Sequence, residues 1–308
     1  FTVTKKRTRT TYVLKYKKGE IMKKLILCLF LLSVGAFTFA HDTHYFMQGE
    51  KDIVSATPYG NNPAAGKYVS VGDTKIYYEV YGKGEPLLVL HGGGVGCTYE
   101  MGRFIDELSK DYMVIAPSTR GQGKSGIGTK AITYEQKAKD IMAAVDKVTK
   151  KPMIILGFSD GAFTAYKIAS MYPKRVKKIV AIGAGELDPA THQFPVLTLD
   201  ALAQYDKRFI EEKKALSPEP EKLPDFLNRY YAFFNSVKVG KELFSSIKCP
   251  VLLIAGELDA NAPLDTVISA YKMLPNAQLA IIANAPHQAF IANYDAVWAN
   301  IKPFLNSK

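Results

Sequence analysis

The fold is decided by one stretch, Pro152-Met153-Ile154-Ile155-Leu156-Gly157-Phe158-Ser159-Asp160-Gly161. Its first five residues form a short, continuous apolar run, which is typical of a buried parallel strand. A helical pattern follows over residues 162–169 and stops before Pro173. A serine between two glycines at such a turn can take a strained backbone conformation, because glycine has no Cβ to clash. The serine hydroxyl would then stand beside a helix N-terminus, as in a nucleophile elbow, although a tight turn with a solvated serine is the alternative.

Strands and helices alternate on both sides of this stretch. Residues 68–71 and 75–80 predict a β-hairpin, and buried or half-buried strands are predicted at 86–90, 113–116, 176–182, 251–255 and 278–282. Helices are predicted at 99–108, 133–148 and 289–305, and Thr133 with Gln136 forms a candidate capping box at the start of the second. This rhythm predicts an α/β fold with a mostly parallel, doubly wound sheet covered on both faces.

Two segments depart from the rhythm. Residues from about 187 to 247 are helical in pattern, rich in proline and aromatics, and contain no clear strand, so they predict a small helical cap inserted into the domain. Residues 41–66 are polar and turn-rich, and we expect a loose lead-in there, with His41 and His44 in a frayed terminus rather than at a metal. The domain itself is expected to span residues 67–306.

The formal net charge of +11 is concentrated at the N-terminus. Residues 1–40 hold nine Lys or Arg and one acid, whereas the remainder has 31 basic and 28 acidic residues. The body of the chain therefore gives no electrostatic reason to expect nucleic-acid binding. Residues 22–40 combine a basic start, an apolar run and Ala40 at a plausible cleavage point, which predicts a signal peptide and export to the periplasm or the medium. We expect residues 1–21 to be a translated leader.

Four features fall where predicted strands end. They are the loop His91-Gly92-Gly93-Gly94, Ser159, Asp259 within Gly256-Glu257-Leu258-Asp259, and His287 within Ala285-Pro286-His287. Open α/β sheets place their sites at the carboxyl ends of their strands, so these residues are expected to converge.

The set of motifs resembles the α/β-hydrolase fold family, with the chain order Ser, Asp, His. The similarity covers roughly residues 67–306, and Gly157-Phe158-Ser159-Asp160-Gly161 is similar to the elbow of small serine hydrolases that include valacyclovir hydrolase. The resemblance implies a catalytic triad of Ser159, Asp259 and His287.

The same resemblance implies an oxyanion hole made by the backbone N–H groups of Gly93 and Asp160. Glu257 and Asp265 compete with Asp259 for the place beside the histidine, and the family spacing favours Asp259. His91 is expected to anchor the oxyanion loop.

In the cap, Phe226, Tyr230, Phe233 and Phe234 lie on one helical face. Core packing against the sheet domain is the favoured interpretation, and a wall of the substrate site is the alternative. Phe158, Phe226 and Tyr230 are the candidate substrate-binding residues. We expect no cofactor, no metal and no membrane span in the mature protein, and the oligomeric state stays open.

The predicted function is an exported serine hydrolase that cleaves carboxylic esters of small or medium apolar substrates through an acyl-enzyme. The same triad in an aminopeptidase or amidase, a lactonase, a carbon–carbon hydrolase or an acyltransferase is the alternative. A non-catalytic binding protein with a hydrolase fold is an alternative of another class, against which the complete set of Ser, Asp, His and oxyanion loop argues.

Overall fold

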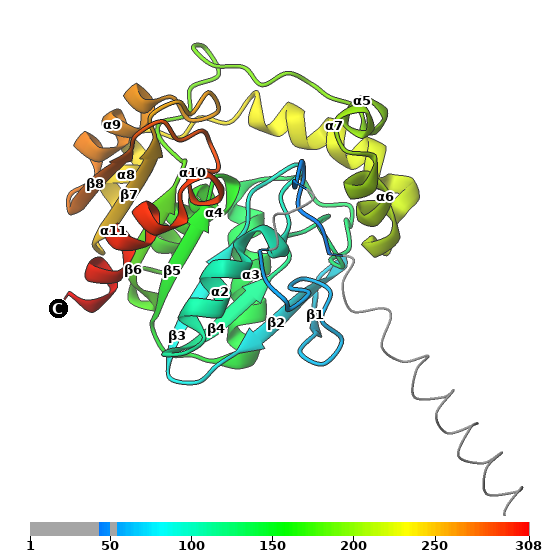
Figure 1. Ribbon diagram of the computed structural model, residues 1–308, viewed down its shortest axis with the longest axis horizontal. Coiled ribbons are helices and arrows are strands. Elements are labelled where there is room, and N and C mark those ends of the chain that lie inside the picture. The colour runs from blue at the N-terminus through cyan, green and yellow to red at the C-terminus, as the bar shows by residue number, and fades with distance from the viewer. Residues whose placement is uncertain (1–42, 50–53, 308) are drawn as a thin grey trace, which may run out of the picture. The chain divides into compact units, whose positions relative to one another are not determined.

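The computed structural model describes residues 43–49 and 54–307, and at its centre is an eight-stranded sheet (Figure 1). The strands are β1 (Lys67–Val71), β2 (Thr74–Tyr81), β3 (Glu85–Leu90), β4 (Tyr112–Pro117), β5 (Met153–Phe158), β6 (Val176–Ile182), β7 (Val251–Gly256) and β8 (Ala277–Ile282). Their order across the sheet is β1-β2-β4-β3-β5-β6-β7-β8. The pairs β1–β2 and β2–β4 are antiparallel and all others are parallel, which confirms the predicted mostly parallel sheet.

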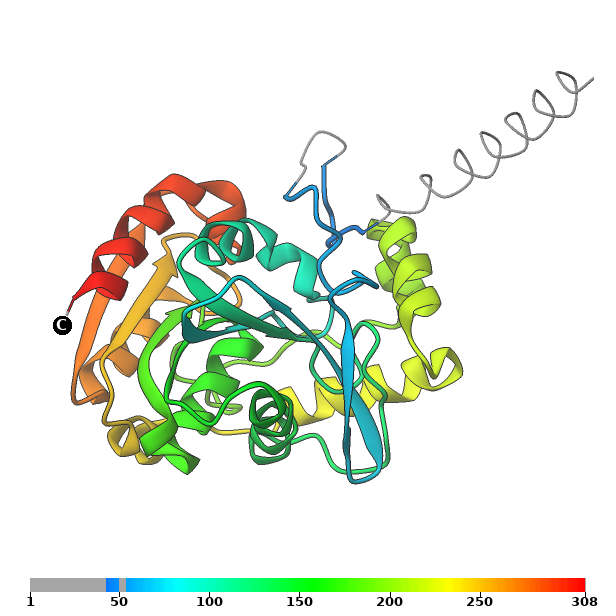
Figure 2. The same ribbon diagram turned by 90° about the horizontal axis from the view of Figure 1, so that it is seen from below.

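Helices cover both faces of this sheet (Figure 2). One face carries α3 (Tyr134–Val148), α4 (Asp160–Met171), α8 (Lys241–Ser246) and α9 (Leu264–Met273); the other carries α2 (Gly102–Leu108), α10 (Ala289–Ala292) and α11 (Tyr294–Asn306). Short 3-10 turns, η1 (Thr98–Met101) and η2 (Pro173–Arg175), complete the connections. Alternate side chains of β3 point to opposite faces of the sheet: Leu88 and Leu90 pack on the face that carries α4, and Leu87 packs on the face that carries α2.

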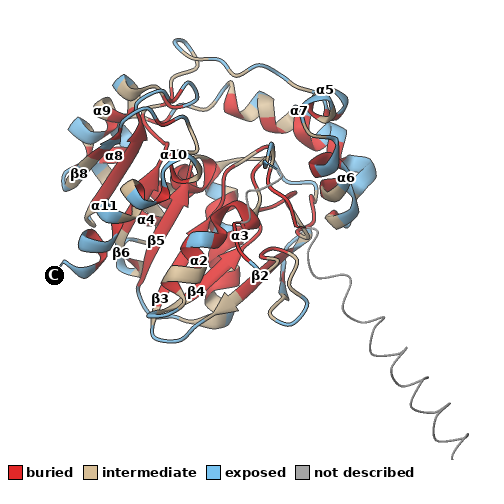
Figure 3. Ribbon diagram, viewed as in Figure 1, coloured by how far each residue is buried: buried red, intermediate tan, exposed pale blue. Residues whose placement is uncertain are grey.

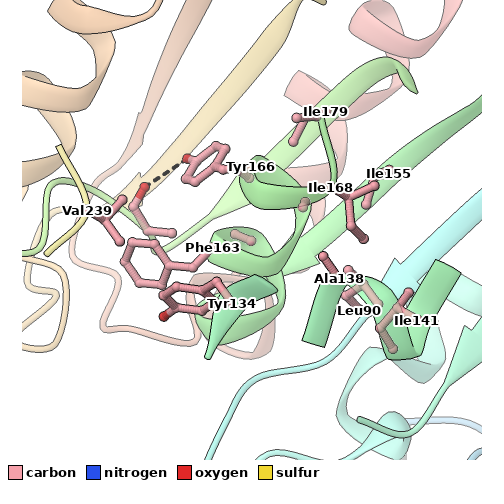
Figure 4. Close-up of a cluster of buried hydrophobic side chains, with 14 of the residues drawn as sticks. Leu90, Tyr134, Ala138, Ile141, Ile155, Phe163, Tyr166, Ile168, Ile179 and Val239 are labelled. Atoms are coloured by element: carbon pink, nitrogen blue, oxygen red, sulfur yellow. Dashed lines mark hydrogen bonds between the residues drawn. The ribbon is translucent and has the colours of Figure 1, made fainter. Parts of the chain in front are cut away.

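The core follows the central strands, of which β5 and β7 are buried at every residue, whereas the outer helix surfaces are exposed (Figure 3). On the α4 face, Phe163, Tyr166 and Ile168 pack with residues of β3, β5 and β6 (Figure 4). The Tyr166 hydroxyl, which is fully buried, donates to the carbonyl of Ala184 at 2.9 Å. Each large apolar side chain buried here contributes about 1.5–3 kcal/mol to stability. This packing fixes the N-terminus of α4, where Ser159 lies.

The cap is inserted between β6 and β7 and lies over the carboxyl ends of the strands (Figure 1). It contains α5 (Leu199–Tyr205), α6 (Lys207–Leu216), η3 (Pro220–Lys222) and α7 (Leu223–Phe234). Leu187 and Val239 close its base, because the N–H of each donates to the carbonyl of the other, at 2.9 and 2.8 Å. The predicted cap ran to about residue 247, but α8 packs on the sheet domain, with Phe244 against Tyr166 at 5.2 Å between ring centroids.

The expectation of a loose lead-in over residues 41–66 is wrong for the part of it that the structure describes. Thr43, His44 and Tyr45 are buried, as are Val54 and Ser55. His44 contacts Asp206 of the cap, 162 positions later in the chain. The sequence gives no sign of this docking because the contacts that hold the segment are made by distant residues.

Two further differences concern helices. The predicted helix over 289–305 is divided at Asn293, whose side chain accepts a hydrogen bond from the N–H of Ala296 at 3.1 Å and so starts α11 as a new helix. Helix α9 was not predicted, and its N-cap residue is Pro263, which makes no side-chain cap. Without a capping signal, a short helix is hard to detect in sequence.

The predicted leader (1–21) and signal peptide (22–40) lie outside the described residues, so export stays a prediction. Within the described part of the chain, no helix has the length and apolar character needed to span a membrane.

Candidate active site

Ser159 occupies the sharp turn between β5 and α4. Its backbone has φ 50° and ψ −117°, a conformation that costs energy for a residue with a side chain. The turn is closely packed: a Cβ on Gly157 would come within 2.6 Å of the carbonyl oxygen of Gly161, and a Cβ on Gly161 within 2.5 Å of that of Leu90. The two glycines are therefore required by close backbone contact, and the turn has the geometry expected of a nucleophile elbow.

His287 lies after β8 and faces this serine. Its Nε2 is 3.0 Å from the Ser159 Oγ, and its Nδ1 is 2.8 and 2.9 Å from the two carboxylate oxygens of Asp259. The ring of Phe158 packs against the imidazole, with 4.8 Å between centroids. The structure therefore brings Ser159, His287 and Asp259 into one hydrogen-bonded chain.

Asp259 is held in place from its other side. Its Oδ1 accepts hydrogen bonds from the N–H groups of Asn261 and Ala262, both at 2.8 Å, and the residue is 5% exposed. The two competing carboxylates lie elsewhere: Glu257 accepts from the N–H of Asn284, and Asp265, in the first turn of α9, accepts from the N–H of Thr266. Of the three candidates, Asp259 is the one that contacts His287.

Two backbone N–H groups near Ser159 have no acceptor among the described residues. They belong to Gly93 and to Asp160, the first residue of α4. A Cβ on Gly93 would overlap the hydroxyl oxygen of Tyr230, so no other residue fits there. Two donors that are free and close to a nucleophile can stabilise a developing oxyanion.

The loop that carries Gly93 is fixed at several points. The N–H of Gly92 donates to Glu100 Oε1 at 2.7 Å, and the carbonyl of Gly94 accepts from Gln122 and from Lys213, each at 3.2 Å. His91, at the base of the loop, accepts from the N–H of Thr119 at 3.0 Å. Burial lowers the pKa of His91 to about 4, so the imidazole is neutral and anchors the loop.

Glu100 is a buried carboxyl group at this loop, and burial raises its pKa from 4.5 to about 8. Between these values the folded protein holds a proton that the unfolded chain has released. The free energy of unfolding should therefore fall as the pH rises from 5 to 8, by up to about 1.4 kcal/mol per pH unit from this group. In Glu100→Gln the acceptor for Gly92 remains and the ionisation is lost, so urea unfolding at several pH values should show a flatter dependence. If the free energy of unfolding depended on pH in the same way in both proteins, the raised pKa of Glu100 would be contradicted.

Among the described residues, the side chain of Asp160 is paired with Lys137 and forms no hydrogen bond to Ser159 or His287. Both of its carboxylate oxygens are 2.7 Å from Lys137 Nζ, and both residues are buried. The ammonium group also lies 4.6 Å from the ring centroid of Tyr230 and 5.3 Å from that of Phe233. The pair leaves no net charge behind the elbow, and breaking it would leave a buried charge without a partner.

A cavity of about 330 Å³ opens beside Ser159 and His287. Apart from the reacting loop, it is lined mostly by apolar and aromatic side chains, which are Phe46, Met47, Val95, Phe158, Phe194, Pro195, Leu197, Leu202, Tyr230, Tyr231 and Phe234. Two of the three predicted substrate-binding residues, Phe158 and Tyr230, are in this lining. The third, Phe226, is not: it is 2% exposed and packs against Gly121, on the side of α7 that faces the sheet domain.

Several residues of the cavity wall were not predicted. The sequence places the segment 194–197 in the cap but does not predict that it lines the cavity. Asn235 holds this segment: its side-chain oxygen accepts from the N–H of Phe194 at 2.7 Å, and its side-chain nitrogen donates to the carbonyl of Phe194 at 2.9 Å. Phe46 and Met47 were assigned to the loose lead-in. Proline and aromatic composition could have suggested the first segment, but no sequence signal indicated the second.

No cluster of three or more His, Cys, Asp or Glu side chains able to hold a metal ion occurs in the part of the chain that the structure describes.

Comparisons with known proteins agree with this geometry. The model of the alpha/beta hydrolase fold family matches residues 85–234. Pyrrolizixenacetamide deacetylase of Xenorhabdus hominickii is 32% identical over 116 residues, which are 38% of this chain and 44% of that protein. A pimeloyl-[acyl-carrier protein] methyl ester esterase of Vibrio parahaemolyticus is 21% identical, over 75% of this chain and 98% of the esterase.

Human serine hydrolase BPHL is 24% identical over 75% of this chain and 83% of its own length, in line with the narrower resemblance seen at the elbow. Among solved structures, a meta-cleavage product hydrolase from Pseudomonas fluorescens superposes with a TM-score of 0.66 at 20% identity, and the match covers 80% of this chain and 99% of that one. The chain is a hydrolase of the alpha/beta hydrolase fold family.

Proposed function

We propose that the protein is a serine hydrolase that cleaves carboxylic esters with small or medium, uncharged apolar groups. The observation that carries the proposal is the hydrogen-bonded chain from Asp259 through His287 to Ser159, which ends at an apolar cavity. A hydroxyl group is a poor nucleophile until a base accepts its proton, and this arrangement supplies the base.

In the proposed reaction, Ser159 Oγ attacks the ester carbonyl carbon while His287 Nε2 takes the hydroxyl proton. The carbonyl oxygen becomes an oxyanion, which accepts hydrogen bonds from the N–H groups of Gly93 and Asp160. His287 then returns the proton to the leaving alcohol oxygen as the carbon–oxygen bond breaks. Water attacks the resulting acyl-serine in the same manner, and the acid is released with Ser159 restored.

The role of Asp259 is to hold one tautomer of the histidine. Because its carboxylate accepts from Nδ1–H, the Nε2 lone pair faces the serine and can take its proton. The carboxylate also stabilises the imidazolium that forms during each step.

The charges around the cavity favour an uncharged substrate. Glu100 is the single Asp, Glu, Lys or Arg side chain among the described residues that line it, and its raised pKa of about 8 keeps it mostly protonated at pH 7. Asp160, beside the nucleophile, is paired with Lys137. An aminopeptidase would have to bind the free α-ammonium group of its substrate, and a desolvated ammonium requires a charged partner. The one acidic side chain among the described lining residues, Glu100, already accepts a hydrogen bond from the N–H of Gly92 at 2.7 Å, so esters are favoured over aminoacyl amides.

The proposal is tested with p-nitrophenyl esters of rising acyl length, measured beside aminoacyl p-nitroanilides, homoserine lactones and a vinylogous 1,5-diketone. We expect the highest kcat/KM for an uncharged ester of medium acyl length, and at least about 100-fold less for the aminoacyl amides, because about 3 kcal/mol separates a paired from an unpaired buried charge. A preference for the lactone, the diketone or an amide would replace the ester assignment while retaining the triad. No turnover of any substrate would contradict the proposal.

A further inference from the structure

Residues 43–49, called here the strap, form an extra layer of the protein beside the cap. The match to the family model begins at residue 85, so the strap lies outside it. Figure 2 shows this segment, in dark blue, next to the helices of the cap. The segment lies against both the sheet domain and the cap. Tyr45 belongs to the apolar cluster on the face of the sheet that carries α2, whereas Phe46 packs against the cluster that includes residues of the cap.

Asp206, the N-cap residue of α6, is the anchor of the strap. One carboxylate oxygen accepts from the N–H of Phe209 at 2.9 Å and caps the helix. The other accepts from the N–H of Met47 at 2.7 Å and lies 2.9 Å from His44 Nε2. Although burial opposes ionisation, these hydrogen bonds lower the pKa of Asp206 and keep it charged.

The anchoring places two apolar side chains at the active-site cavity. Phe46 and Met47 line the same cavity as Ser159 and His287. Phe46 is held edge-on against Phe209 of α6, with 5.5 Å between ring centroids. Met47 has φ 62° and is 63% exposed, so the backbone bends there and leaves a long, adaptable apolar side chain at the rim.

A methionine with positive φ that leaves 63% of its surface exposed at the mouth of a cavity points to a role for its side chain there. A substrate that carries an apolar chain would supply the missing contact. A substrate with a short chain, held at Ser159, would not extend as far as the rim.

We propose that the strap is a substrate-binding element in which Phe46 and Met47 form one wall of the cavity and select substrates with longer apolar chains. The inference rests on the proposed hydrolase function. The residues that select the substrate thus include a segment that precedes the matched family region, and Asp206 acts as a positioning residue that reaches the substrate only through the strap.

The first test compares Phe46→Ala and Met47→Ala with Tyr205→Ala, which removes an aromatic side chain from α5 that is 65% exposed and does not line the cavity. For octanoyl esters, each strap variant should raise KM or lower kcat/KM by about 5- to 20-fold, the effect of losing one apolar side chain contact. For acetyl esters the loss should be clearly smaller than for octanoyl esters, and Tyr205→Ala should change neither value.

The second test separates the anchor from the stability of the cap. Asp206→Asn retains an oxygen that can cap α6 but loses the charge and one of the two acceptor oxygens, whereas Thr198→Ala removes the matching N-cap of α5, where Thr198 accepts from the N–H of Ala201 at 3.1 Å. Asp206→Asn should show the same selective loss on octanoyl esters, and Thr198→Ala should not. An equal loss on both esters in the strap variants, or no loss on either, would overturn the inference.

Labelling rates with ethyl and octyl fluorophosphonates distinguish this outcome from a failure of the proposed function. Such probes react with the serine whether or not the natural bond is an ester, so the ratio of octyl to ethyl labelling should fall in Phe46→Ala and Met47→Ala even if the ester panel shows no turnover. An unchanged ratio would overturn the role of the strap while leaving the triad in place.

Discussion

Ser159→Ala should lower kcat for ester hydrolysis by about 10⁵- to 10⁶-fold, the loss measured when a triad serine is removed from other hydrolases. The physical reason is that no other described hydroxyl lies within hydrogen-bond distance of His287 Nε2, so the imidazole would have no nucleophile to activate. The fold should be unaffected, because alanine carries the same Cβ as serine at the strained φ of 50°.

This prediction is checked by two measurements on the same protein. Hydrolysis of the best ester gives the rate, and mass spectrometry of the peptide that contains residue 159 shows whether a fluorophosphonate adduct forms. Ser236→Ala is the matched control, since Ser236 is an exposed cap serine whose hydroxyl donates to the carbonyl of Phe233. Retention of about one hundredth of the activity, or an adduct on another serine, would show that the nucleophile is wrongly assigned.

The elbow could be predicted from sequence because its geometry depends on residues next to one another. A buried strand, two glycines and a helix start within 157–161 leave few backbone solutions, and the observed φ of Ser159 is the one that the pattern demands. The carboxyl ends of parallel strands then bring Asp259 and His287 to the same edge, although they are 100 and 128 positions away from the serine. Regular alternation of strands and helices therefore predicts long-range proximity here.

The walls of the cavity could not be predicted in the same way. Helical spacing puts Phe226 and Tyr230 on one side of α7, but only the structure shows that the first turns to the sheet domain and the second to the cavity. The strap was missed for a stronger reason. The polar strap is held by hydrogen bonds from His44 and Met47 to Asp206 of the cap. No local pattern around the strap or around Asp206 indicates that these residues meet.

Asp259→Asn should lower kcat by about 10⁴-fold and leave KM nearly unchanged. The amide oxygen can still accept from the N–H groups of Asn261 and Ala262, so the loop should keep its conformation. The amide NH₂ would then face His287 Nδ1, which must become the acceptor. The proton moves to Nε2, and the imidazole can no longer take the proton of Ser159. The loss is in chemistry and not in binding, because the substrate cavity is untouched.

Glu257→Gln and Asp265→Asn are the matched controls for this substitution, since each changes a neighbouring carboxylate that contacts a backbone N–H and not the histidine. Both should retain activity within about twofold of the parent protein, as expected for surface substitutions away from the reacting groups. The measurement is kcat for the best ester across pH 6 to 9, together with the rate of fluorophosphonate labelling, which should fall with kcat because both require the activated serine. If Glu257→Gln lost as much activity as Asp259→Asn, the hydrogen bond of 2.8 Å between Asp259 and His287 would not be the one that sets the tautomer, and the acid of the triad would have to be reassigned.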